Sequence, residues 1–287
     1  MKKDLPVIFI FDLDNTLIGH SDIYNGYKTL LDFIADKCKH KKINGPICDI
    51  NKDHWKEIIP DNLFRPHLKQ GFNDIKSIYP TAEFFIFSKG TKNYVTSFVE
   101  IIEKRFDIKF NRPIFAREDA SPSGIYTYQK DIVGYQDTIC KALYKKYPKL
   151  KQEKYKQLVF TERSLIIDDD ADVWQKDPRQ IVCKEYNYLP TYEIDSNILE
   201  IIRLNPLVQQ FIKENSDYRL PIPFVSSDKS YEECRMDYHV YLANHYRKNL
   251  ADNLEQLKDD FFIKFVTLLR KRKHLAKPFK NLSKLKI

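Results

Sequence analysis

Four apolar runs stand out along the chain. The first is Val7–Phe11, in which all five residues are apolar, and the others lie within AEFFIFSKG (82–90), RSLIIDDDADVW (163–174) and QIVCKEYNYL (180–189). A short apolar run of this kind indicates a strand buried on both faces, as in the centre of a parallel sheet. The pattern therefore predicts four strands, with a further short strand and turn in RPIFARED (112–119).

Between these runs, apolar residues recur every three or four positions, which is the spacing of an amphipathic helix. One such stretch is residues 24–41, whose apolar face holds Tyr27, Leu30, Leu31 and Ile34. The others are residues 65–80, 91–106 and 131–157, the last broken at Pro148, while residues 41–64 form an irregular insertion. Strands that alternate with helices predict an α/β fold, with a mostly parallel sheet and helices on both faces. Such folds bind ligands at the carboxyl ends of their strands.

The last third of the chain has no strong strand pattern. From Met236 to Leu268 the apolar residues keep the helical spacing, which predicts one long amphipathic helix or two joined helices. Its apolar stripe must be buried, by default on the rest of the chain, or else against a second copy in a homodimer. We expect a main domain over residues 1–194, a helical C-terminal region over 195–269 and a basic tail over 270–287.

The charge of the chain is unevenly distributed. Hydrophobic residues at 43% and charged residues at 31% are ordinary for a globular protein. Residues 264–287 hold nine Lys or Arg and no Asp or Glu, and without these nine the formal net charge falls from +8 to −1. A block like this is typical of a solvated or partner-binding tail. We expect it to bind an acidic protein or nucleic acid, or to serve as a nuclear localisation signal; the alternative is a solvated terminus without a partner.

Other compositional features bear on location. No apolar run approaches the roughly 18 residues of a membrane span, so we expect no membrane partner. The five cysteines are odd in number and include no CxxC pair, which favours reduced thiols in the nucleus or cytoplasm. Cys38, His40, Cys48 and His54 have zinc-capable side chains, but their spacing is not that of a standard zinc site. Abundant Lys, Ile and Asn fit an AT-rich genome such as that of a large virus or a protist, and a viral protein of this kind would be associated with the virion.

Polar side chains follow three of the predicted strands at the point where each strand ends. They are Asp12 and Asp14, then Ser88, then Asp168, Asp169 and Asp170. Parallel strands would bring these side chains to one crevice, where clustered carboxylates repel one another unless a cation lies among them. Oxygen ligands of this kind suit Mg²⁺, which commonly bridges carboxylates and a phosphate. Helix capping explains a single Asp, but three strand ends together favour phosphoryl transfer.

The same residues lie in motifs that resemble those of a known family. DLDNT (12–16) is similar to the DxDxT signature of the haloacid dehalogenase superfamily. FRPHLKQGF (64–72) and FFIFSKGTKNYV (84–95) resemble segments of the small and the transcription-factor-IIF-associated RNA polymerase II carboxy-terminal-domain phosphatases. IFARED (114–119), YQKDI (128–132) and IIDDDADVW (166–174) follow in the order of that family. The resemblance covers Val7 to about Tyr188 and implies a haloacid dehalogenase-like Rossmannoid fold.

The resemblance also implies roles for individual residues. Asp12 would attack phosphorus and form an aspartyl-phosphate, and Asp14 would act as general acid and then general base. Thr16 would hold the loop, while Ser88 and Lys130 would bind the phosphoryl oxygens. Mg²⁺ would be held by Asp12, by the backbone of Asp14 and by Asp168 and Asp169, directly or through water.

Two features depart from the family pattern or leave a choice open. The family has Arg where this chain has Asp170, which adds a negative charge beside the metal loop. Arg163 is a second candidate for the cation that neutralises phosphate, although Lys130 lies in the better motif. In the insertion over residues 41–64, Trp55 is expected either to form a wall of the substrate groove or to pack in the core.

Three functional hypotheses follow. The first is a Mg²⁺-dependent phosphatase that acts on phosphoserine or phosphothreonine in a protein substrate. The second is a catalytically silent member of the same family that serves as an assembly scaffold, for example in a viral or nuclear complex. The third is a phosphatase of the same fold that acts on a small molecule or a nucleic-acid end. Intact Asp12, Asp14, Ser88, Lys130 and Asp168 favour an enzyme over a scaffold.

Overall fold

The computed structural model describes most of the chain. The described residues are 4–40, 44–119, 121–122, 128–174, 177–188, 198, 201–202, 205–206, 208–209 and 253–274. They divide into two compact units, which are described separately below. The first contains the described residues of Met1–Ile18, Phe64–Tyr186 and Lys258–Ile287, and the second those of Gly19–Leu63 and Asn187–Leu257.

A four-stranded parallel sheet forms the centre of the first unit. Its strands, in the spatial order β2-β1-β5-β6, are β2 (Ala82–Ile86), β1 (Val7–Phe11), β5 (Ser164–Asp168) and β6 (Gln180–Val182). All three neighbouring pairs are parallel. The four predicted strands are therefore confirmed. The fifth predicted strand, in RPIFARED, is reduced to a single bridge between Phe87 and Phe115, followed by the 3₁₀ helix η4 (Arg117–Asp119).

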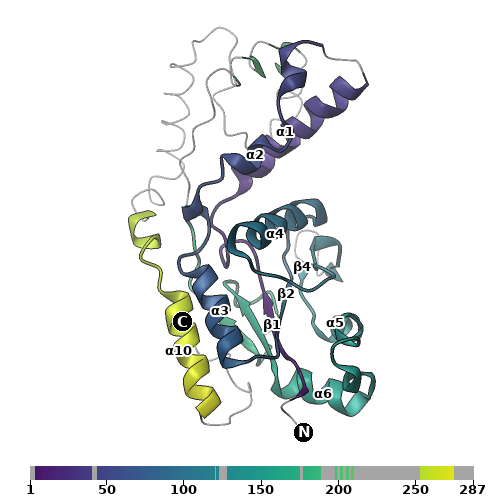
Figure 1. Cartoon of the computed structure of the whole chain (residues 1–287), viewed down its shortest axis with the longest axis vertical. Helices are drawn as coiled ribbons and strands as arrows, with labels where there is room; N and C mark the ends of the chain where they lie inside the picture. Colours follow the sequence, from purple (N-terminus) through teal and green to yellow (C-terminus); the bar gives the residue numbers. More distant parts are fainter. Residues whose placement is uncertain are drawn as a thin grey trace. The chain divides into compact units, whose positions relative to one another are not determined.

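The two faces of this sheet are covered by different helices, because successive side chains of a strand point to opposite faces. Ile8 and Ile10 of β1 belong to a buried cluster with residues of α5 (Gln136–Leu143) and α6 (Glu153–Glu162). Phe9 and Phe11 face α10 (Phe261–His274) and α3 (Leu68–Ile78), with ring centroids 6.3 Å from Phe265 and 4.9 Å from Phe72. Figure 1 shows α3 and α10 on one side of the strands and α5 and α6 on the other. The predicted α/β fold class is confirmed.

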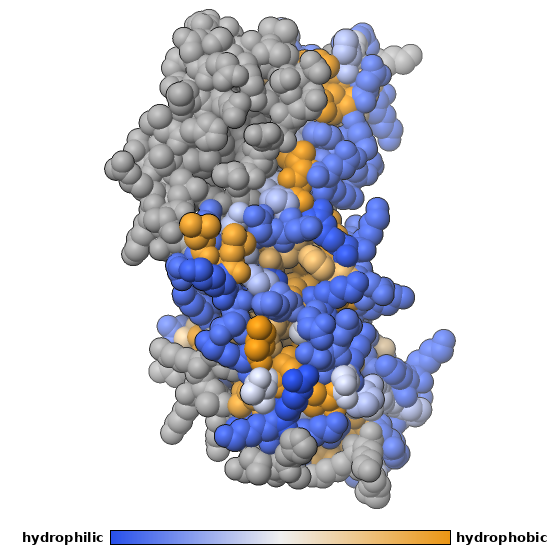
Figure 2. All heavy atoms as spheres, turned by 60° about the vertical axis from the view of Figure 1, so that its left-hand side comes forward, coloured by the Kyte–Doolittle hydropathy of each residue, from blue (hydrophilic) through white to orange (hydrophobic). Residues whose placement is uncertain are grey.

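Helix α10 packs closely along α3. Gly71 of α3 makes this approach possible, because a Cβ atom at that position would lie 2.2 Å from Cδ1 of Phe262. The buried residues of α10 are Phe261, Phe262, Phe265, Val266 and Leu269. Its basic end also contacts α3, since Arg270 pairs with Asp74 at 3.4 Å and Lys273 donates a hydrogen bond to the carbonyl of Ile78 at 2.5 Å. Figure 2, with the α10 side brought forward, shows a described surface that is mainly hydrophilic with separate hydrophobic patches.

These contacts bear on the predicted C-terminal region. Within the described part of the predicted helix over residues 236–268, the chain is helical over residues 253–256, is interrupted over residues 257–260, and is helical again from Phe261, where α10 starts. The tail boundary expected at residue 270 falls inside α10, which continues to His274. The rest of the predicted helix, from Met236, and residues 275–287 of the predicted tail lie outside the described residues.

The second unit is built around α1 (Asp22–Lys39), whose predicted apolar face is buried. The insertion after it contains three short helices: η2 (Pro46–Asp49), α2 (His54–Glu57) and η3 (Asp61–Leu63). Trp55 of α2 has only 1% of its surface exposed, so it is a core residue and not the wall of a groove.

A disulfide joins Cys38 and Cys48 in this unit, with their Cα atoms 5.7 Å apart. The expectation that all cysteines are reduced is therefore wrong for this pair, because η2 folds back beside the end of α1. The bond also removes both thiols from the zinc set considered above. Cys140 and Cys183 are free and buried, and Cys234 lies outside the described residues.

The remaining elements of the first unit are α4 (Lys92–Phe106), the short strands β3 (Ser121–Pro122) and β4 (Tyr128–Gln129), and the 3₁₀ helices η5 (Val133–Tyr135) and η6 (Pro148–Lys151). The strands β3 and β4 form a separate antiparallel pair. A search of the described helices found none with both the length and the hydropathy required to cross a membrane.

Candidate active site

The site lies where three neighbouring strands of the sheet end. Asp12 follows β1 directly, Asp168 is the last residue of β5, and Ser88 comes two residues after the end of β2. Since β2, β1 and β5 are adjacent and parallel, their carboxyl ends lie side by side. The convergence expected from the sequence is therefore observed.

The loop after β1 turns sharply, which separates the orientations of Asp12 and Asp14. Asn15 has a φ of 56°, in the left-handed region that Asn tolerates better than most residues. Leu13 and Leu17 are fully buried and anchor the loop on either side of the turn. Within the loop, the amides of Leu17 and Ile18 donate to the carbonyl of Leu13.

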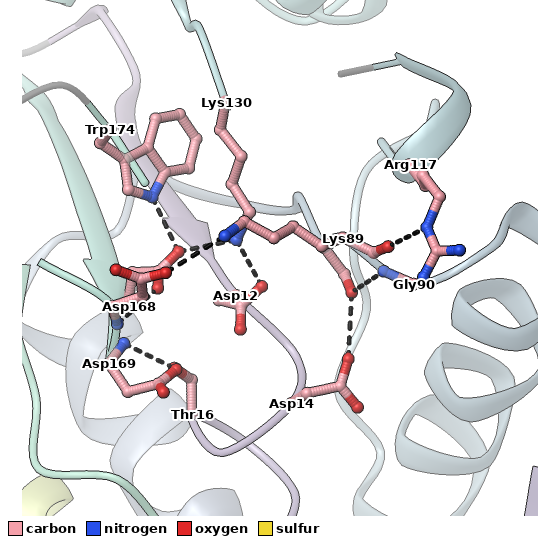
Figure 3. Close-up of polar contacts among 12 residues, drawn as sticks. Asp12, Asp14, Thr16, Lys89, Gly90, Arg117, Lys130, Asp168, Asp169 and Trp174 are labelled. Carbon is pink, nitrogen blue, oxygen red and sulfur yellow. Dashed lines mark hydrogen bonds and ion pairs between the residues drawn. The ribbon is translucent and has the colours of Figure 1, made fainter. Parts of the chain in front are cut away.

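Lys130 lies between two of the acids. Its Nζ donates to Oδ1 of Asp12 at 2.5 Å and to Oδ2 of Asp168 at 2.7 Å, as Figure 3 shows. The Nε1 of Trp174 donates to the same Oδ2 of Asp168 at 2.7 Å. All three charged side chains are buried, so the ammonium and the carboxylates interact in a medium of low dielectric.

Burial and charge shift the pKa values of this group in opposing ways. Burial raises the pKa of Asp12 well above its ordinary value; Lys130 counteracts this, while the nearby Asp168 adds to it. Burial alone would lower the pKa of Lys130, but the charges of Asp12 and Asp168 and its hydrogen bonds to them raise it. Lys130 is therefore a permanent cation at neutral pH. A further positive charge at Asp12 would favour its ionised form.

Asp169 completes the acidic group. One carboxylate oxygen from each of Asp12, Asp168 and Asp169 lies within 4.8 Å of the others. Thr16 orients Asp169: its Oγ1 donates to Oδ1 of Asp169 at 2.9 Å and accepts from the backbone N of Asp169 at 3.1 Å. Burial, with Asp168 nearby, raises the pKa of Asp169 to about 6. A donor set made of three carboxylates fits Mg²⁺.

Asp14 points away from this group, toward β2 and α4. Ser88 Oγ donates to its Oδ2 at 3.2 Å, and the hydroxyl of Tyr94, in the first turn of α4, donates to its Oδ1. The backbone N of Gly90 in turn donates to Ser88 Oγ at 2.9 Å. Asp14 is thus held by two hydroxyl groups, and Figure 3 shows its carboxylate apart from the group formed by Asp12, Lys130 and Asp168.

The structure also places the residues that sequence reasoning left open. Arg163 lies just before β5, at the opposite end of that strand from Asp168, where its guanidinium donates to the backbone carbonyls of Leu5 and Pro6. It is therefore remote from the acids, and Lys130 is the cation of the site. Asp170 forms a surface ion pair with Lys89, with Nζ and Oδ2 3.1 Å apart. The hydrogen bond from Lys89, together with that from the backbone N of Asp172, lowers the pKa of Asp170 against the opposing effect of burial.

Three residues of the site were not predicted: Tyr94, Trp174 and Arg65. Each lies inside a quoted motif, so the motifs carried a signal for them. The partners of two of them depend on the fold, because Tyr94 is 80 residues from Asp14 and Arg65 is 49 residues from Thr16, whereas Trp174 is only 6 residues from Asp168.

Of the comparisons with known proteins, one identifies a family. The family model of the NLI interacting factor-like phosphatases matches residues 7–219. Among solved structures, the chain is similar to Fcp1, an essential RNA polymerase II CTD phosphatase, at 15% identity and a TM-score of 0.42, covering 96% of this chain and 63% of that one. It is also similar to a fission yeast Fcp1 variant bound to beryllium fluoride, at 15% identity and a TM-score of 0.36, covering 90% of this chain and 68% of that one. At TM-scores this low, neither likeness adds to the family match. The search of curated proteins found no match.

Proposed function

The chain belongs to the NLI interacting factor-like phosphatases, and on this premise we propose that it hydrolyses phosphoserine or phosphothreonine in a protein substrate. The reaction would pass through an aspartyl-phosphate on Asp12. The observation that supports this most directly is the separation of two carboxylates in one loop, with Asp12 beside Lys130 and Asp14 held by Ser88 and Tyr94.

In the proposed first step, Oδ of Asp12 attacks phosphorus and the bond from phosphorus to the serine or threonine oxygen breaks. Lys130 neutralises charge on the phosphoryl oxygens and opposes the effect of burial on the pKa of Asp12, which favours the ionised nucleophile. Asp14 donates a proton to the leaving oxygen. In the second step Asp14 removes a proton from a water that attacks phosphorus, the bond from phosphorus to Asp12 breaks and phosphate is released.

The remaining residues prepare the site for these steps. Asp12, Asp168 and Asp169 would hold Mg²⁺, which when bound supplies positive charge to the phosphoryl oxygens. Thr16 keeps Asp169 oriented toward this position. Ser88 donates to Asp14, so its proposed role toward the phosphoryl group requires it to exchange this acceptor for a phosphoryl oxygen.

The test is hydrolysis of a phosphoserine peptide and of an aryl phosphate by the full chain with Mg²⁺. We expect activity that is lost with a chelator and restored by added Mg²⁺. Asp12→Asn should lower kcat by more than about a thousandfold, since the amide is not a nucleophile, with little change in Tm. Asp172→Asn, an exposed acid in the loop after β5, is the matched control and should retain activity.

Each other outcome points to a different conclusion. Wild-type turnover in Asp12→Asn contradicts the aspartyl-phosphate mechanism. Turnover of phosphosugars or phosphorylated oligonucleotides, with none of phosphopeptides, contradicts the protein substrate. A folded wild-type chain with no turnover of any of these favours a scaffold.

A further inference from the structure

A buried arginine connects the loop of the site to the C-terminal segment. Arg65 has 1% of its surface exposed and lies between β6 and the loop after β1. Its guanidinium donates five hydrogen bonds. Two go to the carboxylate of Asp259, from Nε to Oδ1 at 2.9 Å and from Nη2 to Oδ2 at 3.0 Å. Of the others, Nη1 donates to the carbonyl of Thr16 at 2.9 Å and to Sγ of Cys183 at 3.4 Å, and Nη2 donates to the carbonyl of Lys184 at 2.5 Å.

Thr16 alone lies between Arg65 and Asp169 of the site. Arg65 binds the backbone carbonyl of Thr16, while the side chain of Thr16 binds both the backbone N and the carboxylate of Asp169. Arg65 therefore fixes one end of the loop that carries Asp12 and Asp14, and through Thr16 it affects the orientation of Asp169.

Asp259 supplies the charge that allows this arginine to be buried. Only 9% of its side chain is exposed, and its two oxygens accept the parallel donors of the guanidinium, the geometry that makes an Arg–carboxylate pair strong. Its Oδ1 also accepts from the backbone N of Phe261 at 3.1 Å, and the Phe261 ring lies 4.5 Å from Cζ of Arg65. The start of α10 thus encloses the guanidinium with both a charge and an aromatic face.

Asp259 lies beyond residues 7–219, the part of the chain that the family model matches. The charge partner of Arg65 therefore comes from a segment that the family assignment does not cover. Removing it would leave a buried cation without a counter-charge, and Arg65 would turn toward water and release Thr16.

We propose that Asp259 is a positioning residue: through Arg65 and Thr16, the C-terminal segment holds the nucleophile loop in its active geometry. This inference rests on the proposed phosphatase activity for its kinetic consequences only.

The experiment compares full-length Asp259→Asn with wild type at a temperature well below both Tm values. We expect kcat for an aryl phosphate to fall by about 10-fold or more, with KM changed by less than about 3-fold, since an orienting contact and not a substrate contact is lost. Amide hydrogen exchange of a peptide spanning Asp12–Ile18 should quicken, while exchange of β2 stays at the wild-type rate. Asp260→Asn is the matched control, because Asp260 is next to Asp259 in the sequence but forms an exposed pair with Lys264. This variant should leave both readouts unchanged.

A second comparison separates positioning from stability. In Arg65→Met/Asp259→Leu, both buried charges are replaced by apolar side chains, so Tm should recover relative to Asp259→Asn. The carbonyl of Thr16 still lacks its donor, so kcat should stay low and exchange of the loop fast. If Asp259→Asn does not fold, the double variant gives the loop exchange and kcat that decide the question.

The results that overturn the proposal are distinct from those that overturn the function. If Asp259→Asn shows wild-type kcat and wild-type loop exchange, the contact is only structural. If Asp259→Asn is unfolded, the same result in the double variant leads to the same conclusion. An inactive wild type removes the proposed function, and loop exchange alone then decides whether Asp259 positions the loop.

Discussion

At the scale of single residues, the site depends on hydrogen bonds that give two aspartates of one loop different surroundings. Asp12 contacts a cation, whereas Asp14 accepts from two neutral hydroxyls, those of Ser88 and Tyr94. For a carboxyl group that donates a proton and later accepts one, a fixed orientation toward the reacting oxygen matters more than a charged neighbour. Tyr94 is therefore expected to hold Asp14 in line with the leaving oxygen.

Tyr94→Phe tests this expectation, because it removes the hydroxyl and keeps the ring. Protonation matters most for a poor leaving group, so kcat/KM for a phosphoserine peptide should fall about 10-fold or more, while that for an aryl phosphate with an acidic phenol falls less than about 3-fold. Single-turnover kinetics measure both. Tyr155→Phe, on α6, is the control, and an equal loss for both substrates would argue against a role in proton transfer.

At the scale of elements, α3 and α10 meet at a glycine. Ala normally stabilises a helix by about 1 kcal/mol relative to Gly. At position 71 the added Cβ would lie 2.2 Å from Cδ1 of Phe262, so the helices would have to move apart. The close approach bears on the proposed positioning role, because α10 begins two residues after Asp259, which pairs with Arg65.

Gly71→Ala should therefore destabilise the protein by about 1–3 kcal/mol, as overpacking does. Chemical unfolding measures the change. Gly134→Ala is the matched control, since the nearest atom to its Cβ would be Oδ2 of Asp131 at 3.6 Å, an ordinary contact. The double variant Gly71→Ala/Phe262→Ala should show non-additivity, with the alanine at position 71 costing little once the ring is gone. Additive losses would mean that the two residues do not press on one another.

At the scale of the whole molecule, the basic C-terminal segment divides into two parts. Residues up to His274 belong to α10, where Arg270 pairs with Asp74 and Lys273 contacts Ile78. Removal of residues 270–287 would therefore disturb the first unit as well as delete charge. Residues 275–287 hold four lysines and no acid, and for these we propose the docking role on an acidic protein or nucleic acid.

Deletion of 275–287 should leave aryl-phosphate hydrolysis within about 2-fold of wild type and weaken binding to a DNA duplex or heparin. Because Lys–phosphate contacts release counterions, the dependence of binding on salt should become shallower. Titration at several salt concentrations measures this. Changing Lys277, Lys280, Lys284 and Lys286 to Gln keeps the length and should reproduce the effect. Unchanged polyanion binding in both variants would refute the docking role.

The sequence by itself determined the four strands and the polar residues at their ends. These are local properties: an apolar run predicts a buried strand, and the residue after it lies at a carboxyl edge. The motif order also assigned the family, and with it Asp12, Asp14, Thr16, Ser88, Lys130, Asp168 and Asp169. Each of these lies at or beside the observed site.

Only the tertiary structure decided which side chains of the site and its surroundings contact one another. Lys130 reaches Asp12 across 118 residues, and Arg65 reaches Asp259 across 194 residues. No local sequence pattern predicts either pairing, because a buried charge needs a counter-charge close to it in space, whatever their separation in sequence. The same holds for the Cys38–Cys48 bond, which a count of scattered cysteines argued against and which the fold of η2 beside α1 produces.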